Sequence, residues 1–194
     1  VYKKTISCEG CLYGSYHPLN ITFDDDGICS GCLVHDEKDI IDWTEKENDL
    51  KKLVNAYKSK SKGLFDCIVP VSGSRDSFFI VDYVVNVLKL HPLLVTYNKQ
   101  YSTKEGFYNL ALIKRKFDCD LVTKTVDPSV VKKITRATLR RFGSIYWHCI
   151  AGQTVFPVQV ATRMKVPLII WGCHQGLDQT GMFSHHDQVE MTRK

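Results

Sequence analysis

The stretch LFDCIVPVSGSRDS, residues 64–77, joins an apolar run to a short polar loop. Residues 64–71 are the kind of short, nearly continuous apolar segment that forms a strand buried on both faces of a parallel sheet. Residues 72–77 contain hydroxyl groups and a glycine, and an apolar segment with helical periodicity follows from residue 78. The stretch therefore predicts a buried strand, a tight loop and the N-terminus of a helix.

A loop of this kind is a candidate anion site. The unpaired backbone N–H groups at the start of a helix and the positive end of the helix dipole point at the same place. Ser72, Ser74 and Ser77 add hydroxyl donors. The sequence G-x-x-x-x-G-K-[ST] is absent, and so is G-x-G-x-x-G. The residues alone leave open an ordinary turn in which Ser74 or Asp76 caps the helix.

The chain beyond this loop alternates between predicted strands and helices. Further strands are predicted at 93–97, 120–123 and 167–172, and helices at 78–90, 103–117, 128–142 and 150–165. Pro157 is expected to kink the last helix or end it early. This order predicts an α/β fold, a Rossmann-like parallel sheet with helices on both faces and right-handed crossovers. Ligands of such sheets bind at the carboxyl ends of the strands, near a reversal of strand order.

Four of the eight cysteines lie in two C-x2-C pairs near the N-terminus, at Cys8, Cys11, Cys29 and Cys32. Two such turns supply the four thiolates of a tetrahedral zinc site, and a complete thiolate shell indicates a structural ion rather than a catalytic one. Two disulfides or four unrelated thiols are the alternatives. We expect a small zinc ribbon over residues 1–43, a helical linker over 44–62 and the α/β domain over 63–194.

The composition of the chain predicts a globular protein rather than a membrane-spanning or secreted one. Of 194 residues, 44% are hydrophobic and 24% are charged, so a packed core is expected. No apolar run approaches the ~20 residues of a membrane span, and the N-terminus has no apolar core like that of a signal peptide. We therefore expect a cytoplasmic protein. The net charge of +5 does not require a nucleic-acid partner. Because the chain begins at Val1 and stops at Lys194, we expect a fragment truncated at its C-terminus.

The loop Ser72-Gly73-x-x-Asp76-Ser77 after a first apolar strand resembles the PP-loop of the adenine nucleotide alpha hydrolase-like superfamily. Enzymes of that superfamily bind the pyrophosphate of ATP and transfer AMP to a substrate oxygen. Within it, the chain resembles the N-acetyl sugar amidotransferases of bacterial lipopolysaccharide, surface-polysaccharide and flagellin-sugar biosynthesis. The matched blocks occur in order along the chain at 21–32, 66–73, 92–98, 147–149, 157–159 and 167–172.

The resemblance implies an ATP site at the loop. Residues near the adenine and ribose are then Pro70, Val71, Thr96, Tyr97 and Gly172. The residues around the β,γ-pyrophosphate are Ser72, Gly73, Ser74, Arg75, Asp76 and Ser77. Mg2+ offsets the phosphate charge, with Asp76 as its partner, and Asp76 and Ser77 are candidate catalytic residues. The family loop usually reads Ser-Gly-Gly-Lys-Asp-Ser, so Ser74 and Arg75 depart from it. A Cβ at position 74 crowds the loop if this position needs a positive φ.

The resemblance also implies a reaction and a partner. The amide oxygen of an N-acetylated, nucleotide-linked sugar attacks the α-phosphorus of ATP, and ammonia then displaces AMP to give an acetamidino sugar. In the family the ammonia comes from a separate glutaminase subunit. A nucleic-acid partner is not expected. Two alternatives stay open: an enzyme that adenylates a tRNA base before sulfur transfer, and an inactive ATP-binding fragment.

Several polar residues outside the loop have more than one possible role. The segment Tyr146–Cys149 is a candidate lining of the substrate mouth, and His148 is either a general acid or base or a hydrogen-bonded structural residue. Cys149 is interpreted as a pocket or core thiol. Residues 173–176 follow the last predicted strand on the ligand side. A basic stripe in the helix at 128–142 is either a solvated face or a contact for a nucleotide-sugar diphosphate or RNA.

Overall fold

The computed structural model describes residues 5–17, 21–58, 63–172 and 181–187. The chain divides into two compact units, one containing the described residues up to Lys46 together with 181–187, and the other running from Glu47 to Gly172. The predicted ligand-side segment 173–176 lies outside the described residues. Each unit is considered by itself.

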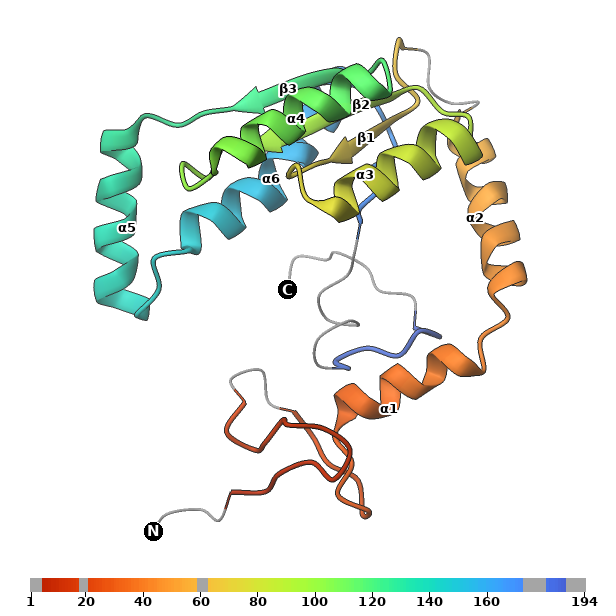
Figure 1. Ribbon diagram of the computed structural model, residues 1–194, viewed down its shortest axis with the longest axis vertical. Helices are drawn as coiled ribbons and strands as arrows, with labels where there is room; N and C mark the ends of the chain where they lie inside the picture. The colour runs from red at the N-terminus through yellow and green to blue at the C-terminus, as the bar shows by residue number, and fades with distance from the viewer. Residues whose placement is uncertain (1–4, 18–20, 59–62, 173–180, 188–194) are drawn as a thin grey trace. The chain divides into compact units, whose positions relative to one another are not determined.

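The larger unit is built on a parallel sheet with the order β1-β2-β3 (Figure 1). Its strands are β1 (Cys67–Pro70), β2 (Pro92–Tyr97) and β3 (Asp120–Lys124). Ile68 pairs with Leu93 in one ladder, and Val95 pairs with Val122 in the other. All three strands coincide with predicted segments, so the predicted α/β class with a parallel sheet is confirmed.

The fourth predicted strand, 167–172, is reduced to a single bridge beside β1. Ile169 pairs with Ile68, through hydrogen bonds from the Ile68 N–H to the Leu168 oxygen (2.9 Å) and from the Ile170 N–H to the Ile68 oxygen (2.9 Å). The next bond of this ladder needs an N–H at position 70, and Pro70 has none. Because this segment lies on the other side of β1 from β2, the strand order reverses at β1.

Helices cover both faces of the sheet, as predicted. Alternate strand residues point to opposite faces. Cys67 and Val69 join one buried cluster with α3 (Arg75–Asp82) and α4 (Lys104–Lys116), while Ile68 joins the other with α6 (Trp147–Met164). Helix α2 (Trp43–Lys58) adds Val54 to the first cluster. Helix α5 (Pro128–Phe142) packs mainly on α6.

Three helix boundaries differ from the prediction. Helix α3 begins at Arg75, directly at the loop, and continues into the π-helix η2 (Tyr83–Val87). Helix α6 begins at Trp147, earlier than predicted, and it runs past Pro157 without ending. Pro157 is buried in the helix, so tertiary packing outweighs the local cost of a missing backbone donor.

The N-terminal unit has little regular structure. It contains α1 (Ser30–Asp36), the 3-10 helix η1 (Glu37–Asp39) and two isolated antiparallel bridges, Ser7 with Gly14 and Phe23 with Cys29. Both the backbone N–H of His185 (2.8 Å) and its ring Nδ1 (3.0 Å) contact Glu37 Oε2. Of the helices in the described ranges, none combines the length and apolar character needed to cross a membrane.

Candidate functional site

The loop after β1 is held between the strand and two helices. The Val71 N–H donates to the Val95 oxygen (2.9 Å), which carries the β2 pairing one residue beyond β1. Gly73 has φ +80°, a left-handed conformation that favours glycine. A Cβ at Gly73 would stand 2.9 Å from the Gly106 oxygen on α4, and the Asn109 side-chain amide donates to the Gly73 oxygen (3.1 Å). Helix α4 therefore fixes the path of the loop.

Three serine hydroxyls meet inside the loop. Ser77 is buried, and its Oγ accepts from the Ser72 N–H (2.9 Å), while the Ser72 hydroxyl donates to Ser74 Oγ (3.0 Å). Among the described residues, the backbone N–H groups of Gly73, Arg75 and Asp76 have no partner. These donors surround the N-terminus of α3, where an anion is stabilised by the helix dipole.

Ser74 stands where the family loop has a second glycine, and its backbone shows whether a Cβ is tolerated there. Its backbone is extended, with φ −77° and ψ 169°, so its Cβ causes no strain. Ser74 occupies the N-cap position of α3, but its side chain makes no capping hydrogen bond. The departure from a second glycine is therefore compatible with the loop, and its hydroxyl belongs to the serine cluster rather than to a helix cap.

The other predicted nucleotide residues gather at the same edge. Pro70 and Val71 lead into the loop, and Thr96 and Tyr97 end β2, with Thr96 buried and Tyr97 half-buried. Gly172 follows the bridge beside β1, and a Cβ there would stand 3.3 Å from Ile80 of α3. All of them lie at the carboxyl ends of parallel segments that flank the reversal of strand order, the usual ligand position of such sheets.

The side chains of Arg75 and Asp76 are exposed in the first turn of α3. They are therefore open to a ligand at the loop. A carboxylate and a phosphate oxygen are the ligands that Mg2+ prefers, so Asp76 has the right chemistry to hold the ion against bound phosphates. A guanidinium at Arg75 can donate two parallel hydrogen bonds to a phosphate.

His148 and Cys149 form a buried pair at the start of α6. Their exposed fractions are 3% and 2%, and Cys149 Sγ lies 3.4 Å from His148 Nε2. Burial lowers the pKa of His148 and raises the pKa of the Cys149 thiol, against a smaller opposing effect of Lys99. At neutral pH the pair is therefore an uncharged imidazole beside an uncharged thiol, and the burial of Cys149 agrees with its interpretation as a pocket or core thiol.

Aromatic rings connect this pair to the end of β2. The ring of His148 lies 6.3 Å from that of Tyr97 and 5.9 Å from that of Tyr101, measured between centroids. A Cβ at Gly152 would overlap the Tyr97 ring, so the glycine lets the ring approach α6. Sequence reasoning missed Tyr101 and Gly152. The i, i+4 spacing from His148 to Gly152 places both residues on one helix face. This spacing could have indicated that Gly152 lies beside His148.

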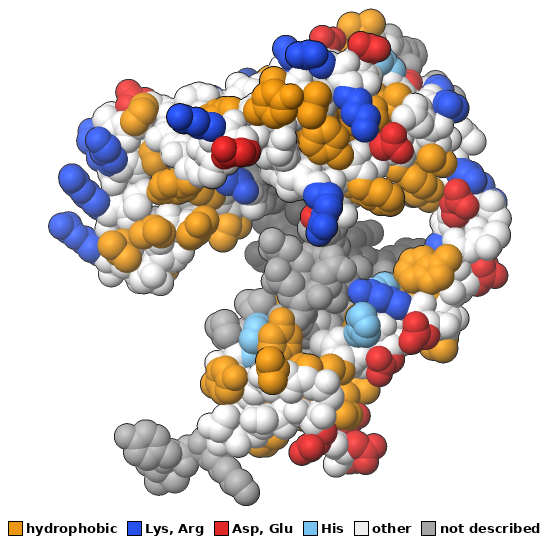
Figure 2. All heavy atoms as spheres, viewed as in Figure 1, with side chains coloured by type: hydrophobic (Ala, Val, Ile, Leu, Met, Phe, Trp, Pro, Cys, Tyr) orange, Lys and Arg blue, Asp and Glu red, His pale blue; other side chains and the backbone are white. Residues whose placement is uncertain are grey.

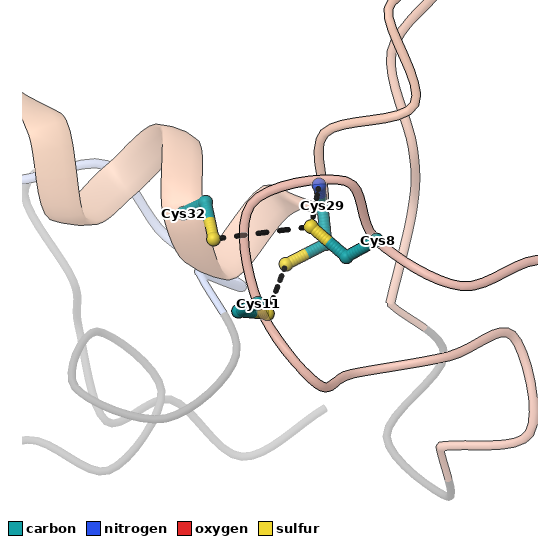
Figure 3. Close-up of side chains that lie close together, drawn as sticks. All are labelled: Cys8, Cys11, Cys29 and Cys32. Atoms are coloured by element: carbon teal, nitrogen blue, oxygen red, sulfur yellow. Dashed lines mark hydrogen bonds between the residues drawn. The ribbon is translucent and has the colours of Figure 1, made fainter.

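The four N-terminal cysteines form one cluster (Figure 3). All four Sγ atoms lie within 4.8 Å of one another, with Cys8 and Cys32 3.9 Å apart and Cys11 and Cys29 3.6 Å apart. Sulfurs about 2.3 Å from a tetrahedral ion stand about 3.8 Å from each other. The cluster is therefore shaped for a single metal ion, and these distances exclude disulfide bonds, in which the sulfurs are about 2.05 Å apart.

Backbone N–H groups prepare this cluster for a cation. Burial alone would raise the pKa of Cys8, but N–H donors from Cys29 (3.2 Å) and Gly10 (3.3 Å) outweigh it and lower this pKa to about 6. Burial and the neighbouring thiols raise the pKa of Cys32. One thiolate thus forms easily, whereas a full set of four requires the positive charge of a metal.

Comparisons with known proteins bear on the fold. No family model matches the chain. It is 26% identical over 120 residues to an uncharacterized protein of Methanocaldococcus jannaschii, a match that covers 60% of this chain and 42% of that protein. The NH3-dependent NAD synthetase of Campylobacter jejuni, solved with a nitrate ion, superposes with a TM-score of 0.50 at 12% identity, covering 70% of this chain and 58% of that one.

The NAD synthetase similarity supports the predicted α/β fold, and at this identity it shows the fold alone. The U34-tRNA thiolase NcsA of Methanococcus maripaludis, solved with its [4Fe-4S] cluster, matches 72% of this chain and 52% of its own, with 13% identity. Its TM-score of 0.29 is below the value at which two folds are considered the same. The chain spans about half the length of the proteins that it matches.

The left-handed Gly73 gives a first prediction. Gly73→Ala should lower the free energy of unfolding by about 1–3 kcal/mol, because alanine is strained at φ +80° and its methyl group meets α4. Ser74→Ala is the matched control, and its effect should stay within about 0.5 kcal/mol because position 74 is extended and exposed. Urea unfolding measures both. Equal stability of the two variants would contradict this account of the loop.

The buried imidazole gives a second prediction. Burial lowers the pKa of His148 below 6.5 in the folded state. Between the two pKa values the unfolded chain is therefore protonated at this residue and the folded chain is not. The contribution of the uncharged His148 to the free energy of unfolding is complete above about pH 6.5. It is lost as the pH falls through the lowered pKa of the folded state. His148→Gln should therefore flatten the dependence of the unfolding free energy on pH between 5 and 7. His186→Gln, at an exposed position, should keep the wild-type slope.

Proposed function

We propose that this chain is the ATP-binding part of an N-acetyl sugar amidotransferase. The observation that carries the proposal is the cluster of unpartnered N–H groups at Gly73, Arg75 and Asp76, at the N-terminus of α3 and at the reversal of strand order. An anion bound there lies beside β1 and β2, where a planar base can reach Thr96 and Tyr97. ATP has both a polyphosphate for the N–H groups of the loop and a planar base for Thr96 and Tyr97. The family resemblance of the surrounding residues supports ATP as the ligand.

The loop residues have distinct roles in this proposal. The N–H groups of residues 73, 75 and 76 hold the β,γ-pyrophosphate, and the hydroxyls of Ser72 and Ser77 add donors. Arg75 retains the positive charge of the family's lysine, with planar donors in place of a point charge. Asp76 would hold Mg2+, and the ion would supply positive charge against that of the leaving pyrophosphate.

The reaction proceeds in two balanced steps. The amide oxygen of the sugar's N-acetyl group attacks the α-phosphorus, the bond to the β-phosphate oxygen breaks, and pyrophosphate leaves. Ammonia then adds to the activated carbon, the bond to the AMP oxygen breaks, and an acetamidino group is formed. The nitrogen that adds must lose a proton, and His148 is an uncharged imidazole close to Tyr97. We assign His148 the role of proton acceptor.

Partners and location follow from the same proposal. Ammonia comes from a separate glutaminase subunit, and the acceptor is a nucleotide-linked N-acetyl sugar. Both substrates belong to the cytoplasmic stage of surface-polysaccharide or flagellin-glycan synthesis.

The metal in the cysteine cluster is proposed to be a structural zinc ion. Four thiolates around one tetrahedral ion leave no open position for a substrate. A four-iron cluster binds each thiolate at a different iron and needs sulfurs further apart than 4.8 Å. With few large buried residues in this segment, metal binding supplies much of its folding free energy.

The enzymatic proposal predicts which substrates release pyrophosphate. With ATP in excess, the purified protein should release more than one pyrophosphate per chain only when UDP-N-acetylglucosamine, as a test N-acetyl sugar nucleotide, and ammonia are both present. Ser77→Ala and Asp76→Asn should each lower this rate by about 10²-fold or more, because each removes a contact to the transferring or leaving phosphates. Release that depends on tRNA instead would support the thiolation alternative. Absence of ATP binding in both the wild type and Ser74→Gly would support an inactive fragment.

The zinc proposal predicts a metal content. One zinc ion per chain should be found by mass spectrometry of metals, in a colourless protein. Cys29→Ser should lose the ion and unfold the N-terminal segment, because Cys29 is fully buried within the cluster. Cys119→Ser, at a buried thiol of the other unit, should keep the full zinc content. A brown protein containing iron, or a metal-free protein with a folded N-terminal segment, would refute the assignment.

A further inference from the structure

Helix α5 is strongly basic for a helix of 15 residues. It contains five basic residues and no acidic residue, at Lys132, Lys133, Arg136, Arg140 and Arg141. These five account for the whole formal net charge of +5, because the remaining 21 Lys and Arg equal the 21 Asp and Glu of the chain. Figure 2 shows Lys and Arg side chains gathered over this helix. Helix α5 therefore carries five positive charges with no acidic residue of its own to offset them.

A cavity of about 330 Å³ opens beside this helix. Lys132 and Arg136, one helical turn apart, line it together with Thr135, Val131 and the ring of Tyr101. None of its lining residues is acidic. By contrast, the larger cavity of about 470 Å³, at the amino end of β3, is lined by Lys114, Arg115 and two aspartates, whose charges cancel.

Thr135 adds an unusual feature to the cavity. Its Oγ1 is the only buried side-chain nitrogen or oxygen of the described residues that has no hydrogen-bond partner. Three other helical threonines of this unit donate to a carbonyl of the preceding turn: Thr138 to Thr135, Thr154 to Ile150 and Thr162 to Val158. A buried hydroxyl without a partner is unfavourable, so rotation of the Thr135 side chain toward an acceptor in the cavity would be favoured.

Tyr101 connects the cavity to the candidate catalytic region. Its ring lines the cavity and also stands 5.9 Å from the ring of His148, which in turn neighbours Tyr97 at the end of β2. Because Tyr101 follows the carboxyl end of β2, a ligand in the cavity lies near the edge of the sheet that also carries the loop after β1. The two sites are separate, because none of the loop residues 72–77 lines the cavity.

We propose that this cavity binds the phosphate of the acceptor, with Lys132 and Arg136 pairing with its oxygens and the Thr135 hydroxyl donating a hydrogen bond. The proposal rests on the proposed function and adds to it the site that recognises a phosphorylated acceptor. Two cations one helical turn apart match a diphosphate, and the apolar wall formed by Val131 and Tyr101 suits the face of an attached sugar ring. An RNA backbone would instead use the full row of cations, including those outside the cavity.

The test compares two pairs of charges on one helix. Lys132→Gln with Arg136→Gln removes the cavity cations, and Arg140→Gln with Arg141→Gln removes the same charge from exposed positions outside it. Calorimetric titration with UDP-N-acetylglucosamine should show affinity about tenfold or more weaker for the cavity pair, and affinity within about twofold of wild type for the outer pair. Thr135→Val should weaken binding about threefold or more, because it keeps the shape and removes the donor.

The outcomes separate this inference from the proposed function. Equal weakening by both pairs, or a probe that competes with ATP for the loop, would overturn the cavity site. Binding of total tRNA that both pairs weaken alike, without binding of the sugar nucleotide, would overturn it in favour of RNA. A wild type that binds ATP but not the probe refutes the inference alone. A wild type that binds the probe through the cavity cations but does not bind ATP upholds the site and refutes the proposed function.

Discussion

The burial of β1 on both faces is the constraint on which the rest of the larger unit depends. Cys67, Ile68 and Val69 are fully buried, with α3 and α4 on one side and α6 on the other. A strand enclosed in this way must satisfy its backbone through parallel neighbours, and β1 has one on each edge. The reversal of strand order follows from these two neighbours, and with it the position of the loop at residues 72–77, at the carboxyl end of β1.

The same strand shows what the sequence could predict and what it could not. A continuous apolar run at 64–71 was sufficient to predict the strand, and the C-x2-C spacing was sufficient to predict the cysteine cluster. The fourth strand was overpredicted because the apolar pattern of 167–172 says nothing about its partner, and Pro70 lacks the N–H that would extend the pairing. The uninterrupted helix at Pro157 depends on packing, which local propensity cannot foresee.

The site was predictable where one segment supplied it and unpredictable where several segments meet. Residues 70–77 are contiguous, so a strand-loop-helix pattern predicts their arrangement directly. Tyr101 reaches His148 from a loop after β2, and Gly152 matters because the ring of Tyr97 packs on it. Contacts of this kind depend on the tertiary fold, which brings residues 47–55 positions apart into contact, and the spacing of His148 and Gly152 on one helix face does not name the rings that meet them.

Two kinds of positive charge on the larger unit suit two different tasks. The loop at 72–77 offers backbone N–H groups and a helix dipole, which are fixed in direction and cannot be titrated or withdrawn. Helix α5 offers full charges on long side chains, which attract an anion from a distance but are screened by salt. In the proposed function, the fixed donors of the loop are suited to a transition state, in which small displacements of the phosphates matter. If the proposed acceptor site is correct, the charges on α5 are suited to capture of a phosphorylated acceptor, which has only to be brought to the same edge of the sheet.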